Sequence, residues 1–176
     1  YVAIKEYYPS GIATRSLDSS QVCVPAENAQ KEYHQGLIRF LKEAQDVARF
    51  QSEPNIVSIY DFLEENETAY MVMEYLHGCT LKQYTKEHGG HLNTDFIVHI
   101  CLSVLDALAV VHNAGMIHRD ISPENIFICE DLTVKLIDFG AAKQVYMDSE
   151  QTISVVLKPG YAPPEQYVKK EKQGPW

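Results

Sequence analysis

One stretch decides how this chain is interpreted: His118-Arg119-Asp120-Ile121-Ser122-Pro123-Glu124-Asn125. A second stretch, Asp138-Phe139-Gly140, begins thirteen residues after Asn125. Phosphoryl transfer needs oxygen ligands for Mg²⁺, a carboxylate that takes or orients the proton of the acceptor hydroxyl, and a cation at the phosphates. Amide and carboxylate oxygens are ligands that suit magnesium. The pattern therefore predicts Asn125 and Asp138 as metal ligands and Asp120 as the catalytic base.

A long helix is predicted just before this stretch, over residues 94–114. Apolar side chains recur there at helical spacing, Asn93 or Thr94 suits the N-cap, and Gly115 suits the C-terminal stop. After the quoted stretch, two short apolar runs around a polar turn predict a hairpin over 125–137. The predicted core-facing stripe of the helix consists of Phe96, Ile97, Ile100, Cys101, Val104, Leu105, Leu108 and Val111.

In the first part of the chain, up to residue 75, the residue pattern predicts strands and one helix. Apolar residues at helical spacing predict a helix over 37–50. The polar stretch 7–36 contains two prolines and two glycines, and we interpret it as an irregular insertion, a tolerated surface loop, with a regulatory or docking loop as the alternative. The predicted strands are 1–4, 56–60 and 69–75, the last two joined by a polar turn at 64–67.

Composition excludes several classes of protein. The formal net charge is −9 at pH 7, which argues against a nucleic-acid binder because such proteins normally present a basic face. The four cysteines are far apart and form no C-x-x-C pair, which favours thiols in a reducing cytosol over a disulfide framework or a zinc site. The apolar runs are short and broken by polar residues, so the sequence predicts no membrane-spanning segment.

The two quoted stretches resemble the H-R-D-x-x-x-x-N catalytic loop and the D-F-G element of eukaryotic-like protein kinases. Val2-Ala3-Ile4-Lys5 matches the V-A-I-K strand of that family, and Ala162-Pro163-Pro164-Glu165 resembles its A-P-E element with an extra proline. These elements follow in the family's order along the whole chain. The Asp120-Ile121-Ser122-Pro123 variant looks like bacterial serine/threonine kinases, so the chain is identified as a member of that group.

The resemblance implies an α+β, bilobal protein-kinase fold. Residues 1–76 would form a partial N-lobe, an antiparallel sheet with one helix, that lacks the glycine-rich loop. Residues 77–176 would form a partial helical C-lobe that runs through the activation segment and lacks the later helices. We expect the kinase part to be cytoplasmic, within a parent protein that could be membrane-anchored.

The resemblance also assigns roles at matching positions. Lys5 would hold the α- and β-phosphates of ATP, and it would pair with a carboxylate of the following helix. Glu43 is the best candidate for this carboxylate and Glu32 the weaker one. The residues that would line the adenine site, with backbone groups of Glu74 and Leu76 bonding the adenine edge, are Ala3, Met73, Glu74, Leu76 and Phe127.

Two positions depart from the family pattern. Ser122 stands where these kinases usually carry a lysine, which removes a cation from the transferring phosphoryl group. Lys158 stands in the segment before the A-P-E-like element, where a threonine that bonds the catalytic aspartate is usual. We expect Lys158 to reach back and replace the missing cation, with an exposed loop lysine as the alternative.

Three functions are compatible with these residues. The first is a serine/threonine kinase that uses Mg²⁺ and ATP on protein substrates and on itself, with a second copy of the chain as partner for trans-autophosphorylation. Phosphorylated Thr152 or Ser154 would then pair with Arg119. The second is a pseudokinase or ATP-binding scaffold, which Ser122 favours. The third is a small-molecule kinase of related fold, which the D-F-G and A-P-E-like elements disfavour.

Overall fold

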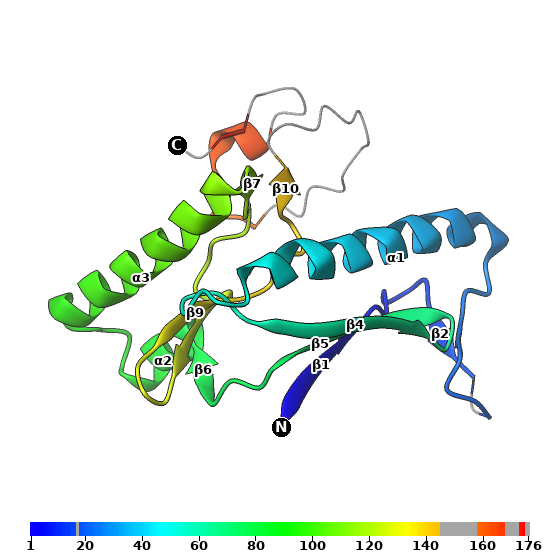
Figure 1. Cartoon of the computed structure of the whole chain (residues 1–176), viewed down its shortest axis with the longest axis horizontal. Helices are drawn as coiled ribbons and strands as arrows, with labels where there is room; N and C mark the ends of the chain where they lie inside the picture. Colours follow the sequence, from blue (N-terminus) through cyan, green and yellow to red (C-terminus); the bar gives the residue numbers. More distant parts are fainter. Residues whose placement is uncertain (17, 145–157, 168–172, 175–176) are drawn as a thin grey trace. The chain divides into compact units, whose positions relative to one another are not determined.

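The computed structural model describes residues 1–16, 18–144, 158–167 and 173–174 (Figure 1). They divide into two compact units. The first consists of Tyr1–Ser52 and Ser58–Leu76, and the second of Glu53–Val57 and His77–Trp176. The sequence-based division after residue 76 assigned residues 53–57 to the first part. Backbone hydrogen bonds tie this short stretch to the second unit instead, from Val57 N to Leu136 O and from Leu136 N to Asn55 O.

The first unit is built on a three-stranded antiparallel sheet with the order β1 (Val2–Glu6), β5 (Thr68–Glu74), β4 (Ile59–Glu65). β4 and β5 form the predicted hairpin, although β4 begins three residues later than predicted. The turn residues Asn66 and Glu67 have φ values of 55° and 59°. Two consecutive left-handed residues give the tight turn whose twist matches that of a hairpin.

Helix α1 (Glu27–Val47) lies along this sheet and continues into the 3₁₀ turn η1 (Ala48–Phe50) (Figure 1). It begins ten residues before the predicted helix. The sequence misled because the first turns carry polar side chains and because Gly36, which lowers helix propensity, lies near the centre. The buried side of α1 still follows helical spacing and includes Tyr33, Gly36, Phe40, Ala44 and Val47.

The rest of the predicted insertion is also built into the fold. Strands β2 (Thr14–Arg15) and β3 (Val22–Cys23) pair in antiparallel register. Ala13, Val22 and Tyr33 are buried together in a small apolar cluster. The interpretation of 7–36 as an irregular surface loop was therefore wrong, because the stretch folds into a short hairpin and the first half of α1.

The second unit combines helices with small sheets. Its main sheet has the order β6 (Gly78–Thr80), β8 (Ile126–Cys129), β9 (Val134–Leu136), so the hairpin predicted over 125–137 is confirmed. Gly78 has a φ of +141°, and a Cβ atom there would lie 2.1 Å from the carbonyl oxygen of Ile128, so only glycine fits. The other elements are α2 (Leu81–Glu87), α3 (Thr94–Asn113), η2 (Pro164–Gln166) and the pair β7 (Met116–Ile117) with β10 (Lys143–Gln144).

Helix α3 has the predicted bounds, and its buried face matches the predicted stripe in part. Oδ1 of Asn93 accepts a hydrogen bond from the backbone N–H of Phe96 at 2.7 Å, as an N-cap does. Ile100 and Val111 of the predicted stripe are buried, whereas Ile97 and Leu105 are 44% and 59% exposed. Apolar side chains surround much of this helix, so periodicity alone drew the stripe too wide. The residues that are buried are Ile100, Ser103, Ala107 and Val111.

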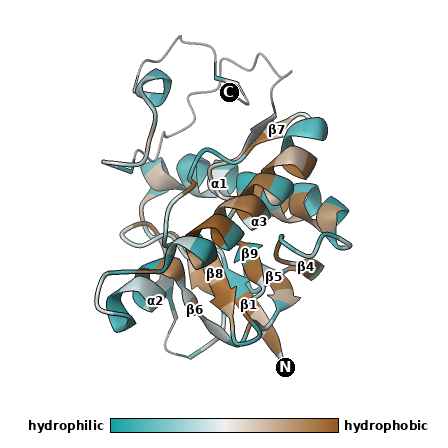
Figure 2. Cartoon of the chain, turned by 90° about the vertical axis from the view of Figure 1, so that its left-hand side faces the viewer, coloured by the Kyte–Doolittle hydropathy of each residue, from teal (hydrophilic) through white to brown (hydrophobic). Residues whose placement is uncertain are grey.

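One helix among the described residues, α3, is long and apolar enough to cross a membrane by length and composition alone. Hydrophobic residues dominate it (Figure 2). The prediction that no segment could span a membrane overlooked this helix. In the structure α3 packs on β9 and β7, and Ile100, Ala107 and Val111 are buried, while Val98, Leu102 and Leu105 are exposed.

His118 is buried in the second unit with 1% of its surface exposed. Its ring lies against that of Phe139, with 4.5 Å between the ring centroids. Burial lowers the pKa of His118 to about 4, because desolvation penalises the charged imidazolium. The side chain is therefore neutral near pH 7, and its Nδ1 atom accepts a hydrogen bond from the backbone N–H of Asp120.

We expect this histidine to make stability fall as the pH falls. Its pKa in the folded chain, about 4, is below the unfolded value of 6.5, so the unfolded state binds more protons between those values. The free energy of unfolding should drop by about 3 kcal/mol from pH 6.5 to 4 through this residue. Denaturant unfolding at several pH values should show a shallower pH dependence for His118→Phe, and equal slopes would contradict the assignment.

Candidate active site

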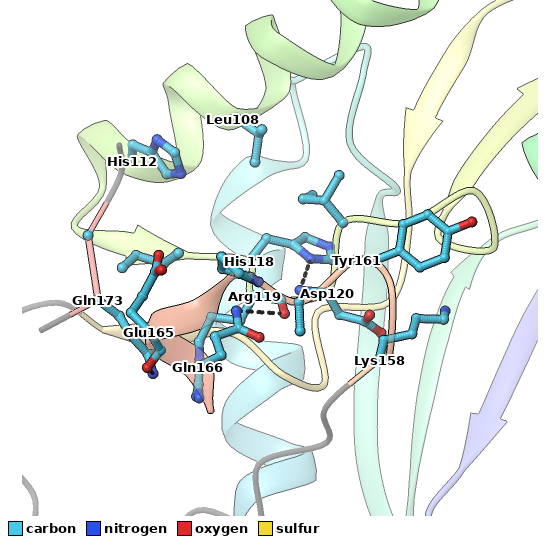
Figure 3. A pocket seen from close by; sticks show the side chains of 15 residues that line it. Leu108, His112, His118, Arg119, Asp120, Lys158, Tyr161, Glu165, Gln166 and Gln173 are labelled. Atoms are coloured by element: carbon cyan, nitrogen blue, oxygen red, sulfur yellow. Dashed lines mark hydrogen bonds between the residues drawn. The ribbon is translucent and has the colours of Figure 1, made fainter. Parts of the chain in front are cut away.

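The loop that carries Asp120 is held by its own hydrogen bonds. The backbone N–H of Asp120 donates to Nδ1 of His118 at 3.3 Å (Figure 3). Nδ2 of Asn125 donates to the Asp120 carboxylate at 2.7 Å and to its carbonyl oxygen at 2.9 Å. Arg119 has a left-handed φ of 70°, which is uncommon for residues other than glycine. This turn places Asp120 beside a buried histidine and beside an amide that orients its carboxylate.

The β8–β9 hairpin brings Asn125 and Asp138 together. The backbone N–H of Ile137 donates to the carbonyl oxygen of Asn125 at 2.9 Å, and Asp138 follows directly with a left-handed φ of 59°. Because Asn125 contacts Asp120 through its amide nitrogen, its amide oxygen is the atom left for a cation. One amide oxygen and one carboxylate match the few protein ligands that Mg²⁺ takes beside phosphates and water. The two residues thus supply ligand types that suit a magnesium ion.

Lys5 and Glu43 form an ion pair within the first unit. Lys5 Nζ on β1 lies 3.2 Å from Glu43 Oε1 on α1, and the Glu43 side chain is only 12% exposed. Lys5 Nζ also lies 5.8 Å from the centroid of the Phe40 ring. Glu32, the weaker candidate, is exposed. The structure thus gives Lys5 the partner that the sequence favoured.

The five residues expected to line an adenine site are distributed over both units. Ala3 on β1 lies opposite Met73 on β5 in the antiparallel register. Glu74 ends β5, and its Oε1 atom accepts a hydrogen bond from the backbone N–H of Ser58 at 2.7 Å. Leu76 ends the first unit, whereas Phe127 lies on β8 of the second.

Lys158 contacts Ser122, the residue that stands where the family pattern has a lysine. Its Nζ atom donates to Oγ of Ser122 at 2.8 Å, and it forms an ion pair with Glu124. Glu124 also pairs with Lys82 at the start of α2. The pKa of the Glu124 carboxyl falls to about 2 because first Lys158 and then Lys82 donate hydrogen bonds to it. Ser122 is 2% exposed, so the ammonium group is fixed beside a buried hydroxyl.

A cavity of about 280 Å³ lies within the second unit, beside Asp120 (Figure 3). Arg119 and Lys158 line it, and Gln166 donates from Nε2 to the carbonyl oxygen of Arg119 at 3.1 Å. Burial lowers the pKa of Arg119, and its Nε atom has no hydrogen-bond partner within the described part of the chain. Thr152 and Ser154, the expected phosphorylation sites, lie outside the described residues.

Sequence reasoning missed two members of this site. Glu124 lies inside the quoted stretch, yet nothing in its position indicated an ion pair with Lys158. Lys82 lies 42 residues from its partner Glu124 in the sequence and belongs to no motif. Such pairs depend on long-range packing, so the only available signal was the unusual lysine at position 158.

Comparison with known proteins places these features in a family. A family model described as "Protein kinase domain" matches residues 13–175. A probable serine/threonine-protein kinase of Clostridium perfringens is 42% identical over 131 residues, which cover 73% of this chain and 18% of that protein. PrkC of Bacillus subtilis, a serine/threonine-protein kinase, is 40% identical over 129 residues, covering 73% of this chain and 20% of PrkC.

A solved structure titled "PpkA-294 apo form" superposes with a TM-score of 0.84 at 37% sequence identity. The match covers 99% of this chain and 60% of that one. The chain spans about a fifth of the length of the two curated relatives. The α+β kinase fold expected from the sequence is confirmed by this similarity, and the chain belongs to the protein kinase family.

Proposed function

We propose that this protein transfers the γ-phosphoryl group of ATP to serine and threonine hydroxyls of proteins, including its own. The observation that carries the proposal is the orientation of the Asp120 carboxylate by Asn125 at 2.7 Å, next to Asn125 and Asp138, the two residues that would hold Mg²⁺. Similarity to proteins named serine/threonine-protein kinases supports the choice of acceptor.

In this reaction the acceptor hydroxyl oxygen bonds to the γ-phosphorus while the bond between that phosphorus and the bridging oxygen of ADP breaks. The hydroxyl proton goes to the Asp120 carboxylate, which Asn125 holds in place. Lys5, oriented by Glu43, would bind the α- and β-phosphates, and Asn125 with Asp138 would hold Mg²⁺. A bound magnesium ion neutralises charge on the phosphate oxygens. Glu74 and Leu76 offer backbone groups to the adenine edge, and Ala3, Met73 and Phe127 offer apolar surface.

In this proposal Lys158 takes over the role of the lysine that is missing at position 122. The cation that usually follows the catalytic aspartate is replaced by Ser122, and Lys158 brings an ammonium group to that serine at 2.8 Å. A cation fixed near the transferring phosphoryl group stabilises the charge that develops there. Because the Ser122 hydroxyl accepts from Lys158 and Glu124 pairs with it, the ammonium group has a defined position before substrate binds.

A second candidate function is a pseudokinase or ATP-binding scaffold without turnover, favoured by the serine at position 122. The retained set of Lys5, Asp120, Asn125 and Asp138 supports catalysis over this alternative.

A kinase that modifies itself would act through a second copy of the chain, and phosphate on the segment that contains Thr152 and Ser154 would pair with the half-buried Arg119. The proposed site of action is the cytoplasm, where ATP is available.

The full-length protein should phosphorylate itself and a protein substrate when it is given Mg²⁺ and ATP. Asp120→Asn should reduce the rate at least 100-fold, because it removes the group that takes the hydroxyl proton. Asp106→Asn, on the exposed face of α3, is the matched control and should be unaffected. Peptide mass spectrometry would locate the phosphates. Tight ATP binding with no phosphate on any hydroxyl would favour the pseudokinase instead.

If Lys158 replaces the lysine missing at position 122, the effects of changing Ser122 and Lys158 on kcat should not be additive. Lys158→Thr alone should lower kcat roughly 100-fold, since it removes the cation from the phosphoryl group. The double variant Ser122→Lys, Lys158→Thr should regain at least tenfold of that loss, because it restores a lysine two residues after Asp120. Lys86→Met on α2 serves as the control for loss of a nearby positive charge. Unchanged turnover of Lys158→Thr would rule this replacement out.

A further inference from the structure

The stretch between β1 and the middle of α1 forms a second small core in the first unit. Ala13, Val22 and Tyr33 are buried there, and Tyr7, Ile12 and Val24 pack against them. We call residues 7–16 and 18–36 the brace. Because its apolar side chains meet one another, the brace has a defined shape rather than that of a loose connection.

Hydrogen bonds fasten the brace to the turn between β4 and β5. The backbone N–H of Val22 donates to the carbonyl oxygen of Asn66 at 2.8 Å, and the Tyr33 hydroxyl donates to that of Glu67 at 2.8 Å. Oγ1 of Thr68 donates to the carbonyl oxygen of Tyr7 at 2.5 Å. The hairpin and the first half of α1 are therefore attached to one end of the sheet.

Aromatic rings connect this attachment to the lysine of the active site. The centroids of Tyr33 and Tyr7 lie 5.2 Å apart, and those of Tyr7 and Phe40 lie 5.8 Å apart. The Phe40 ring lies 5.8 Å from Lys5 Nζ. Glu43 follows Phe40 by three positions on α1, on the same side of the helix. Any movement of α1 that separates Glu43 from Lys5 must also disturb this row of rings.

Gly36 shows how closely the helix and Tyr7 approach. A Cβ atom at this position would lie 1.9 Å from the Tyr7 hydroxyl oxygen and 2.7 Å from its Cζ atom. Tyr7 lies between two other rings and cannot easily give way. A side chain at position 36 would therefore displace either the Tyr7 ring or α1 itself.

The N-cap of α1 makes no side-chain hydrogen bond, because Ala26 occupies it. The charged residues near the two ends, Glu27 in the first turn and Arg49 in η1, contribute only modestly to the stability of a helix. Helices in proteins obtain most of their stability from packing rather than from propensity. The place of α1 along the sheet thus depends on its buried face, to which the brace contributes Tyr33 and Gly36.

We propose that the brace is a positioning element that holds Glu43 against Lys5, so that α1 keeps its catalytic orientation without help from a partner or a modification. This inference rests on the proposed kinase activity for its catalytic consequence. The residues that act through Glu43 are Tyr7, Val22, Tyr33 and Gly36. None of them touches substrate, so each acts by position alone.

The test introduces a charge into the brace core of the full-length protein. Val22→Asp buries a carboxylate at a position that is 3% exposed. We expect kcat to fall about tenfold because the β2–β3 hairpin separates from the sheet. Gln21→Asp adds the same charge at the neighbouring exposed position and should leave kcat unchanged. Amide hydrogen exchange over residues 37–47 should speed up in Val22→Asp alone.

To separate an effect through Glu43 from a general loss of stability, the effect of Val22→Asp on kcat is compared in the unaltered protein and in Glu43→Gln. If the brace acts through Glu43, then Val22→Asp should cause no further loss of kcat in the Glu43→Gln background. An equal loss in both backgrounds, or unchanged exchange over 37–47, would overturn the proposal. Gly36→Ala provides a second variant should Val22→Asp fail to fold, and it should show the same dependence on Glu43. If the unaltered protein lacks kinase activity, the proposed function fails, and the exchange measurement still decides whether the brace holds α1.

Discussion

The active-site loop depends on a neutral histidine that is removed from water. His118 packs against Phe139, and its unprotonated Nδ1 atom accepts from the backbone of Asp120. A protonated ring would lose this acceptor and would place a charge in an apolar core. The same burial joins the loop before β8 to the residues after β9. Asp120, Asn125 and Asp138 thereby obtain their places from a packing contact that takes no part in chemistry.

Each of the two units orients its own proposed catalytic groups by contacts within that unit. The first unit brings Lys5 to Glu43 within 3.2 Å, and the second unit orients Asp120 and fixes Lys158 on Ser122. Each cation is held by a carboxylate, Lys5 by Glu43 and Lys158 by Glu124. The chain therefore maintains positive charge at defined points although its net charge is −9. Local pairing, and not overall composition, determines the electrostatics at these points.

The sequence predicted the parts of this arrangement that local patterns encode. The hairpin before Asp138 and the N-cap at Asn93 follow from short-range rules, and both are present. The start of α1 was missed because its first turns are polar and lack the apolar repeat that marks the second half of the helix. The predicted stripe of α3 was too wide because apolar residues occupy more than one side. The ion pair between Glu124 and Lys82 joins residues that only the fold brings together.

The contacts of the brace also fix an order of events as the chain folds. The hydrogen bond from Thr68 to Tyr7 spans 61 residues, and that from Tyr33 to Glu67 spans 34. A chain made from its N-terminus has synthesised all of α1 before the β4–β5 turn exists. The bonds from Tyr33 to Glu67 and from Thr68 to Tyr7 therefore cannot form until the β4–β5 turn has been synthesised, although α1 itself needs no residue beyond position 47. The brace is thus anchored entirely by a part of the chain that is made after it.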